Sequence, residues 1–98
     1  MSHEVEFAPA ARLDVVEAFD WYEQRAPGLG DAFRLEVRRQ SSRIAETPHQ
    51  FPVVLSEVRV ARLRRFPYSL FFKVEGEKAF VIACFHASRD PRLWEGRQ

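Results

Sequence analysis

Apolar side chains near the start of the chain recur at helical spacing. From Ala10 to about Arg25 they form one stripe, which consists of Ala11, Val15, Ala18, Phe19 and Tyr22. Polar side chains occupy the opposite side of the same segment, namely Asp14, Glu17, Asp20 and Gln24. Recurrence every three to four residues is the period of an α-helix that buries one face, so we predict an amphipathic helix. Trp21 lies off the stripe, and we expect it at the surface, available to a partner.

A second helix is predicted after a short turn. Pro27-Gly28-Leu29-Gly30 ends the first helix, because proline cannot continue it and glycine adopts positive φ without steric cost. Asp31 suits the N-terminus of the next helix, whose apolar stripe consists of Phe33, Val37, Ser41 and Ile44. The helix should end by Thr47, since Pro48 disfavours the α conformation at the residue before it. So short a connection predicts an antiparallel pair of helices.

The second half of the chain has the pattern of extended structure. Residues 53–66 are rich in Val, Leu and Arg, and we expect them to form one strand. Ser69 to Glu75 and Lys78 to His86 are apolar on both faces, which is typical of central strands. Gly76-Glu77 between them has the Gly-X form of a type II′ hairpin turn. A short first strand is expected from Val5 to Ala8.

The predicted order of elements is β-α-α-β-β-β. A helical hairpin packed on one face of a mostly antiparallel sheet is the α+β arrangement that buries the apolar surface of both. From Ser88 onward the chain is polar, with Trp94 as its only aromatic side chain, so we expect a short C-terminal helix or arm. Ninety-eight residues suffice for one hydrophobic core, and we expect residues 1–98 to form a single domain.

The composition is that of an ordinary soluble globular protein, with 46% hydrophobic and 30% charged residues. The lone Cys84 excludes an internal disulfide framework and fits a reducing compartment. Residues 1–11 lack the apolar segment of a signal peptide, and no stretch is long enough to span a membrane, so we expect a cytoplasmic protein. His3, His49 and Cys84 lack the spacing of zinc ligands, so we expect neither a metal nor a cofactor.

Positive charge is concentrated in the second half of the chain. Residues 1–46 carry six Arg against nine Asp or Glu, whereas residues 47–98 carry nine Arg or Lys against five Asp or Glu. The densest clusters are Arg59, Arg62, Arg64 and Arg65, and then Arg89, Arg92 and Arg97 around Trp94. Such clusters are typical of a solvated edge strand and a polar tail. They are equally typical of a surface that binds an acidic protein segment or a nucleic acid, and the charge pattern leaves both interpretations open.

Three motifs in this order resemble the RelE/ParE superfamily of toxins. They are Trp21-Tyr22-Glu23 ahead of Pro27-Gly28-Leu29-Gly30, then Phe66-Pro67-Tyr68-Ser69-Leu70-Phe71-Phe72, then His86-Ala87-Ser88-Arg89-Asp90-Pro91 followed by Trp94 and Arg97. The resemblance extends over about Val5 to Arg97. It implies the toxin of a type II toxin–antitoxin system, of the plasmid-stabilisation kind, silenced by a cognate antitoxin encoded beside it. We expect their complex to be a hetero-tetramer or larger.

The resemblance implies one of two activities. RelE-like members cleave mRNA on the ribosome, whereas ParE-like members poison DNA gyrase. Metal-free RNA cleavage needs a group that takes the 2′-OH proton, a group that protonates the leaving oxygen, and cations around the phosphate. If this chain is a nuclease, the candidates for these catalytic roles are His86, Arg89, Arg62 and Arg65.

Two positions depart from the nuclease pattern. Ser69 stands where RelE-like nucleases tend to place Arg, and Trp94 stands where they often place Tyr. Indole cannot transfer a proton at neutral pH, although it can stack on a base. Both departures favour the ParE-like branch, a gyrase inhibitor that arrests growth. His86 is then either a general acid or base, or a structural residue that fixes the turn into Ser88.

We therefore predict a surface that binds the target or the antitoxin. Its candidate residues are Trp21, Arg59, Arg62, Arg64, Arg65, Arg89, Arg92, Trp94 and Arg97. The expected partners are the antitoxin and DNA gyrase. The alternative partners, for a RelE-like endonuclease, are the ribosome and mRNA. A third alternative is a non-toxic binding module with the same fold.

Overall fold

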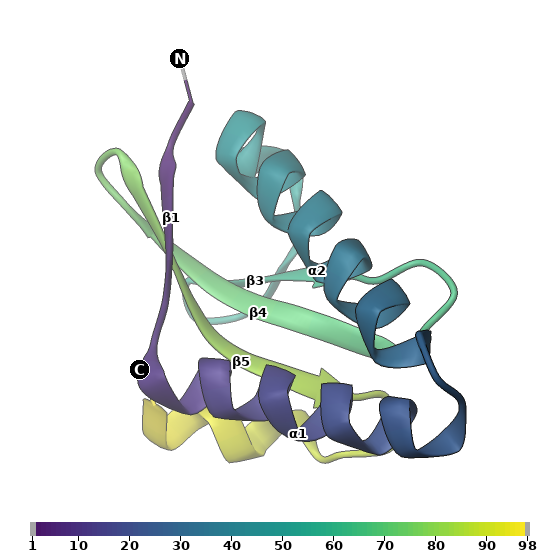
Figure 1. Ribbon diagram of the computed structural model, residues 1–98. Coiled ribbons are helices and arrows are strands. Elements are labelled where there is room, and N and C mark those ends of the chain that lie inside the picture. Colours follow the sequence, from purple (N-terminus) through teal and green to yellow (C-terminus); the bar gives the residue numbers. More distant parts are fainter. Residues whose placement is uncertain (1, 98) are drawn as a thin grey trace.

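A five-stranded sheet carries two helices on one of its faces (Figure 1). The computed structural model describes residues 2–97, apart from the side chain of Pro91. The elements are β1 (Glu4–Phe7), α1 (Pro9–Arg25), α2 (Leu29–Glu46), the 3-10 turn η1 (Pro48–Gln50), β2 (Val53–Leu55), β3 (Val58–Arg62), β4 (Tyr68–Glu75), β5 (Lys78–His86) and the 3-10 turn η2 (Pro91–Arg97). The strand order is β1-β5-β4-β3-β2, with β1 and β5 parallel and the other neighbouring pairs antiparallel. The predicted α+β arrangement, including a short C-terminal helical turn, is confirmed.

The turns that join these elements follow the sequence signals. Gly76 lies at φ +59° between paired Glu75 and Lys78, so the hairpin of β4 and β5 is the expected one. Gly28 lies at φ +87°, and the Glu23 carboxylate accepts the backbone N–H groups of Gly28 and Gly30 at 3.0 and 2.9 Å. A carboxylate at the N-terminus of a helix satisfies donors that the helix itself leaves free.

One predicted strand is in fact two. Residues 53–66 form β2, a turn at Ser56-Glu57, and β3, which doubles back to pair antiparallel with β2. Ser56 takes φ +52° in this turn. The expectation of a single strand was wrong because a stretch rich in Val, Leu and Arg does not distinguish one long strand from two strands joined by a two-residue turn. Arg64 and Arg65 consequently lie in the loop after β3 rather than on a strand.

The main core lies between the helices and the sheet. Its largest side chains come from both helices, from β4 and from the loop before β4; they include Tyr22, Phe33, Phe66, Leu70 and Phe72. Phe33 is fully buried, with its ring centroid 5.4 Å from that of Tyr22 and 5.4 Å from that of Phe66. Aromatic rings at these separations add stabilisation beyond the burial of their area. The Phe66-Pro67-Tyr68 motif thus fastens the helical hairpin to the sheet.

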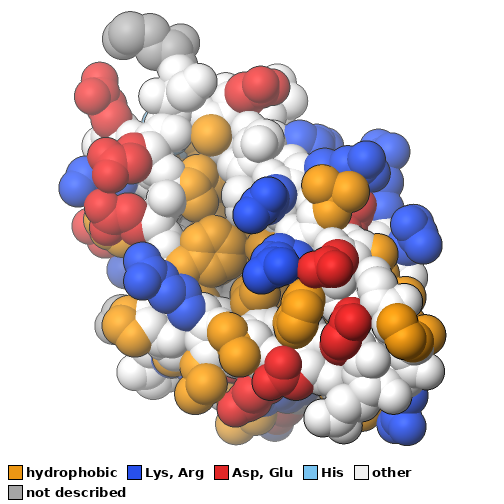
Figure 2. All heavy atoms as spheres, in the orientation of Figure 1, with side chains coloured by type: hydrophobic (Ala, Val, Ile, Leu, Met, Phe, Trp, Pro, Cys, Tyr) orange, Lys and Arg blue, Asp and Glu red, His pale blue; other side chains and the backbone are white. Residues whose placement is uncertain are grey.

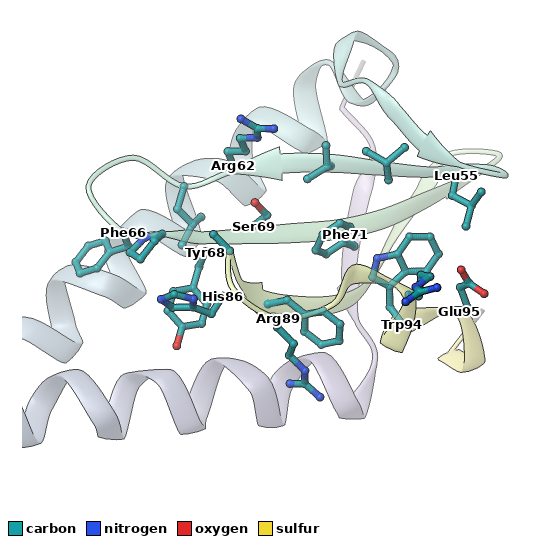
Figure 3. A pocket seen from close by; sticks show the side chains of 17 residues that line it. Leu55, Arg62, Phe66, Tyr68, Ser69, Phe71, His86, Arg89, Trp94 and Glu95 are labelled. Carbon is teal, nitrogen blue, oxygen red and sulfur yellow. The ribbon is translucent and has the colours of Figure 1, made fainter.

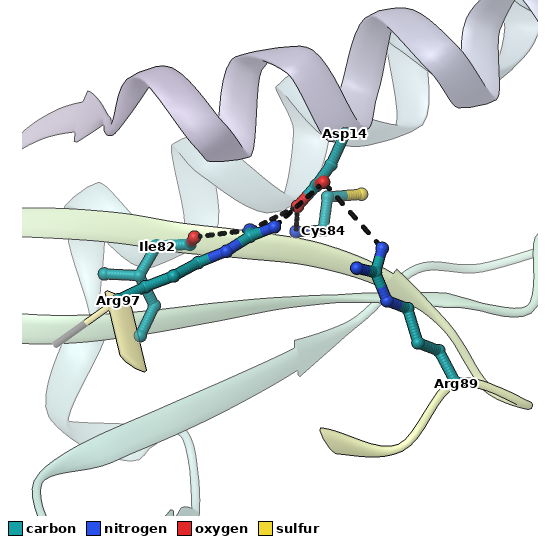
Figure 4. Close-up of polar contacts among 5 residues, drawn as sticks. All are labelled: Asp14, Ile82, Cys84, Arg89 and Arg97. Carbon is teal, nitrogen blue, oxygen red and sulfur yellow. Dashed lines mark hydrogen bonds and ion pairs between the residues drawn. The ribbon is translucent and has the colours of Figure 1, made fainter. Parts of the chain in front are cut away.

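The helical pattern misplaces one residue of α1. Asp14 was assigned to the polar side, yet only 8% of it is exposed. It faces the part of β5 that β1 does not cover, because β1 pairs only with Lys78–Val81. The backbone N–H of Cys84 donates to Asp14 Oδ2 at 3.0 Å (Figure 4). Asp14 therefore supplies the hydrogen-bond acceptor that a neighbouring strand would otherwise provide for the Cys84 N–H.

The C-terminal segment completes this edge of β5. Arg97 Nη1 donates to Asp14 Oδ2 at 2.7 Å and to the backbone oxygen of Ile82 at 3.0 Å (Figure 4). The Asp14–Arg97 ion pair joins α1 to η2, and the hydrogen bonds of both side chains to the backbone attach them to β5. A buried carboxylate persists when it is paired and its remaining acceptor positions are filled, and both conditions hold at Asp14.

A second apolar cluster lies on the face of the sheet opposite the helices. It consists of Val58, Val60, Phe71, Ile82, Ala83, Phe85 and Trp94. Trp94 is only 1% exposed, and its ring centroid lies 5.7 Å from that of Phe71. The indole is buried against the sheet, so as it stands it is not free to stack on a base. Trp94 and Arg97 together hold η2 in place.

We predict that Asp14→Ala destabilises the protein by about 3 kcal/mol, since removing one partner of a buried ion pair leaves the other charge uncompensated. Asp14→Asn should lose less, because its carbonyl can still accept the Cys84 N–H. Urea unfolding of the purified protein measures both. Asp20→Ala, at an exposed position of the same helix, is the control and should stay within about 0.5 kcal/mol of wild type. Equal losses for Asp14→Ala and Asp20→Ala would contradict this role.

We predict that Gly30→Ala lowers stability because α1 and α2 approach closely there. A Cβ atom at Gly30 would lie 2.8 Å from the backbone oxygen of Phe19 and 2.9 Å from two of its ring carbons. Forcing such a contact typically costs about 1–3 kcal/mol. Gly96→Ala is the matched control, since a Cβ there meets nothing within 4 Å. Thermal unfolding should show a lowered Tm for Gly30→Ala alone; a pair of unchanged transitions would refute the close approach.

Candidate functional site

The face of the sheet opposite the helices carries a groove of about 620 Å³ (Figure 3). Its floor includes Val60, Ser69, Phe71 and Phe85, which project from β3, β4 and β5. Val54 and Leu55 of β2 line one side, and residues of η2, including Trp94, line the other. The groove therefore exists because β2 folds back along β3 and because η2 is anchored on the sheet.

Arginines from three segments stand around this apolar floor. Arg62 of β3 pairs with Ser69 of β4, Arg89 lies in the loop after β5, and Arg92 belongs to η2. Arg89 lies with its guanidinium carbon 4.0 Å from the centroid of the Phe85 ring, with a nitrogen 4.0 Å from Asp14. Within residues 2–97, Arg62 has no ion-pair partner. The groove thus combines apolar surface with positive charge that is free to meet an anionic partner.

Arg92 is bound within its own turn. Its guanidinium donates to both carboxylate oxygens of Asp90, with the shortest contact 2.9 Å, and its backbone N–H donates to Asp90 Oδ1 at 3.0 Å. These hydrogen bonds lower the pKa of the exposed Asp90 carboxyl. Arg92 is therefore less available to a ligand than Arg62.

His86 ends β5 and serves the turn that follows. Its Nδ1 accepts the backbone N–H of Ser88 at 2.9 Å, and its ring meets the Tyr68 ring edge-on at 5.2 Å between centroids. A backbone N–H is always a donor, so Nδ1 is unprotonated and the neutral ring carries its proton on Nε2. In this state Nε2 donates and does not accept. With Nδ1 occupied, the neutral ring offers Nε2–H only as a hydrogen-bond donor, and it is not placed to take a proton from a hydroxyl.

Other ionisable groups near the groove are also poorly suited to act as a base. Burial, and then the nearby Tyr22 and Cys84, raise the pKa of Tyr68 above its ordinary value. Burial followed by the Asp14 carboxylate raises the pKa of Cys84 to about 12, so its thiol stays protonated at neutral pH. A phenol and a thiol in these states are neither bases nor strong nucleophiles.

A second hollow of about 510 Å³ adjoins the first. Trp21 and Tyr22 of α1 line it together with Tyr68, His86 and Arg89. Tyr68, His86 and Arg89 line both hollows and separate them. Trp21 is half exposed, as expected, and the guanidinium of Arg25 lies 4.2 Å from the centroid of its ring system.

The structure distributes the predicted site residues over several places. It gathers Arg62, His86 and Arg89 at the groove, with Arg92 at its rim. It places Arg97 in the ion pair with Asp14 and buries Trp94. The remaining predicted residues, Arg59, Arg64 and Arg65, are not among those that line the groove.

Sequence reasoning missed Asp14 and Glu36, both of which are buried carboxylates. Glu36 is 4% exposed and accepts the backbone N–H of Arg64 at 2.9 Å. A signal for Asp14 existed, because it follows Ala11 by three residues and precedes Ala18 by four, which places it beside the apolar stripe. Glu36 lies three residues after Phe33 and has the same kind of spacing.

Among the described residues there is neither a metal site nor a membrane-spanning helix. No three His, Cys, Asp or Glu side chains among them lie close enough together to hold a metal ion. No helix in residues 2–97 is both long enough and apolar enough to cross a lipid bilayer.

Comparison with known proteins places this chain in a family. Residues 5–91 match the model described as the ParE toxin of the type II toxin–antitoxin system, parDE. No curated protein sequence matches the chain. One similar solved structure, a chain of the chromosomal ParDE system from P. aeruginosa, has a TM-score of 0.77 and 19% identity over 87% of this chain and 96% of that one. Another, from the toxin–antitoxin complex RelBE2 of Mycobacterium tuberculosis, has a TM-score of 0.60 and 16% identity over 88% and 99% of the two chains.

At these identities the two structures establish a shared fold. The family model spans nearly the whole chain and agrees with the superfamily and the ParE-like branch that the three sequence motifs indicate. The chain belongs to the ParE toxin family of type II toxin–antitoxin systems.

Proposed function

We propose that this toxin arrests growth by binding DNA gyrase rather than by cleaving RNA, and that a cognate antitoxin neutralises it in the cytoplasm. The observation that carries the proposal is the chemistry of the groove. Cations surround an apolar floor, yet His86 Nδ1 is occupied by the Ser88 N–H and the pKa of Tyr68 is raised. Such a groove suits binding of a macromolecule better than proton transfer.

The groove supplies what a protein interface needs. Phe71, Phe85 and Val60 offer apolar floor, and Arg62 offers an exposed charge at its edge. Aromatic and arginine side chains contribute most of the binding free energy at many interfaces. We place the contact with gyrase here, with Arg62 as one of its contributors.

We expect the purified toxin to inhibit DNA supercoiling by gyrase in a concentration-dependent manner. Arg62→Ala should require about ten-fold more toxin, a change of about 1.4 kcal/mol in binding. Arg12→Ala, which removes an exposed arginine on α1, is the matched control and should behave as wild type. Unimpaired supercoiling together with codon-site mRNA cleavage on ribosomes would overturn the proposal.

A second candidate function is a ribosome-dependent mRNA endonuclease. The observation in its favour is that Arg62, His86 and Arg89 line one groove, where two guanidinium groups could stabilise charge on a phosphate. His86 Nε2–H would be the proton donor in such a reaction only in the imidazolium form, which requires Nδ1 to release the Ser88 N–H and take up a proton. Cleavage that His86→Ala and Arg89→Ala each abolish would establish this alternative. Normal growth on induced expression without the neighbouring gene would instead favour a non-toxic binding module.

The proposed antitoxin partner has two exposed apolar surfaces to cover. Leu13, Val16 and Trp21 on α1 are each 50% exposed or more, and Val53, Val54 and Leu55 on the edge strand β2 are about half exposed. An extended peptide adds readily to a free sheet edge, and an amphipathic helix covers apolar side chains. Both structural neighbours come from toxin–antitoxin systems, which supports the same kind of partner here.

We expect the product of the adjacent reading frame to co-elute with the toxin in size-exclusion chromatography, as a hetero-tetramer or larger. Val54→Lys should weaken the complex by about ten-fold or more, because it places a charge on the β2 edge. Leu35→Lys is the control, since Leu35 is exposed to a similar extent on α2. Separate elution of the two wild-type proteins would count against an antitoxin encoded there.

A further inference from the structure

Five arginines form a row along the side of α2 that faces β3. They come from α2, β3 and the loop after β3, and we call them the α2 row: Arg39, Arg43, Arg59, Arg64 and Arg65. We propose that the α2 row binds the sugar–phosphate backbone of a double-stranded nucleic acid. This surface is separate from the groove, none of whose lining residues belongs to the row. The proposal does not depend on gyrase as the target.

Contacts with Glu36 bring the backbone of Arg64 close to the side chain of Arg39. Glu36 Oε1 accepts the backbone N–H of Arg64 at 2.9 Å, and Glu36 Oε2 lies 3.8 Å from Arg39 Nη1. Arg39 and Arg43 lie one helical turn apart on the same side of α2, a rise of about 6 Å. The spacing of such neighbours is similar to that of successive phosphates along one strand.

Arg43 and Arg59, at one end of the α2 row, both contact Phe51. The guanidinium carbon of Arg43 lies 5.3 Å from the Phe51 ring centroid, and Arg59 Nη1 donates to the Phe51 backbone oxygen at 2.7 Å. Arg59 Nη1 also donates to the backbone oxygen of His49 at 3.2 Å. These acceptors are neutral, so they fix the Arg59 side chain and leave its positive charge in place.

Little negative charge offsets the row. Among residues 2–97, Glu36 is the sole carboxylate within ion-pairing distance of any of its arginines. The Glu36 side chain is 5% exposed and lies beneath the row, whereas the Arg39 side chain is 66% exposed. Figure 2 shows basic side chains gathered beside α2 at the upper right of the view. A line of cations, four of them exposed and Arg59 half-buried, with a single buried carboxylate beside them, is a feature that a phosphate backbone recognises.

The loop at the other end of the row holds its arginines in a strained conformation. Arg65 lies at φ +70°, a region that glycine adopts freely and other residues adopt at a cost. The loop is anchored before Arg65 by Glu36 at the Arg64 N–H, and it is closed by the Leu63 N–H, which donates to the Tyr68 oxygen at 2.9 Å. Both Arg64 and Arg65 are exposed. Strain retained in an anchored, exposed loop indicates a functional constraint on the residue that bears it.

The surroundings of the row favour a duplex over the other acidic partners. A folding peptide needs several apolar anchors among its charged contacts, and two exposed apolar side chains adjoin the row: Leu35, one helical turn before Arg39, and Val53, paired with Arg59. A single strand needs exposed aromatic rings on which its bases stack, and Phe51 is only 8% exposed. A duplex backbone needs only cations in a line.

The test compares two double variants that remove the same charge from opposite sides of α2, one of them including a residue of the loop that packs beside the helix. Arg39→Ala/Arg64→Ala removes two members of the row. Arg34→Ala/Arg38→Ala removes two arginines from the side toward α1, where Arg34 lies 4.8 Å from the Phe19 ring centroid. Both variants have the same net charge, so any difference between them reports position. Arg65→Gly is added, because it removes charge and relieves the positive φ without straining the fold.

Binding is measured by fluorescence anisotropy over a range of KCl concentrations. The probes are a short labelled DNA duplex, an RNA duplex of the same sequence, one separated strand, and a glutamate-rich peptide. We expect Arg39→Ala/Arg64→Ala to bind duplex at least about ten-fold more weakly and to reduce the salt slope by about two, since each lost phosphate contact removes roughly 0.9. Arg34→Ala/Arg38→Ala should keep the wild-type slope, and Arg65→Gly should lose affinity while its Tm stays the same or rises.

Each remaining outcome decides the question. Preference for the DNA or the RNA duplex identifies the source of the backbone and supports the proposal in either case. Equal weakening by the two double variants overturns it, because the effect would then reflect net charge alone. Peptide or single-strand binding without duplex binding also overturns it, in favour of an acidic protein segment or a single-stranded nucleic acid respectively.

Discussion

The rest of this structure depends on the contacts of the buried Asp14 carboxylate, namely its hydrogen bond with Cys84 and its ion pair with Arg97. β1 is too short to cover β5, and the uncovered part of β5 would present an N–H and a carbonyl to solvent at an interior edge. Asp14 of α1 accepts a hydrogen bond from the Cys84 N–H. Arg97 of η2 donates to the Ile82 carbonyl and forms an ion pair with Asp14. A helix, a strand and the C-terminal segment are thereby joined at one buried point.

The groove on the opposite face of the sheet is a consequence of that junction. With Arg97 held by Asp14, η2 lies across the sheet and Trp94 packs on Phe71, which gives the groove one of its sides. The opposite side is β2, which exists because the chain turns at Ser56-Glu57. The result is an apolar floor with arginines around it. At its edge His86 Nδ1 accepts a hydrogen bond and the pKa of Tyr68 is raised. A surface of this kind suits contact with a macromolecule, which is what the proposed inhibition of gyrase requires.

Folding divides arginines that are neighbours in the sequence. Arg62 points to the groove because it shares a face of β3 with Val60, whereas Arg59 belongs to the opposite face. Arg64 and Arg65 leave the sheet altogether and join residues of α2, with Glu36 as the link. One basic stretch of sequence thus supplies two surfaces. Each surface draws its other residues from elements far away in the chain.

The sequence by itself determined the elements whose signals are local. Helical spacing in residues 10–25, the stop at Pro27-Gly28, the hairpin at Gly76-Glu77 and the three ordered motifs specify the helices, the central strands and the family, because each depends on residues close in sequence. Only the tertiary structure decided that Asp14 is buried, that Trp94 is covered and that residues 53–66 fold back on themselves. Spacing along a chain gives the period of an element. The contact of Asp14 with the uncovered edge of β5, and its ion pair with Arg97, depend on elements that come together only when the sheet has formed.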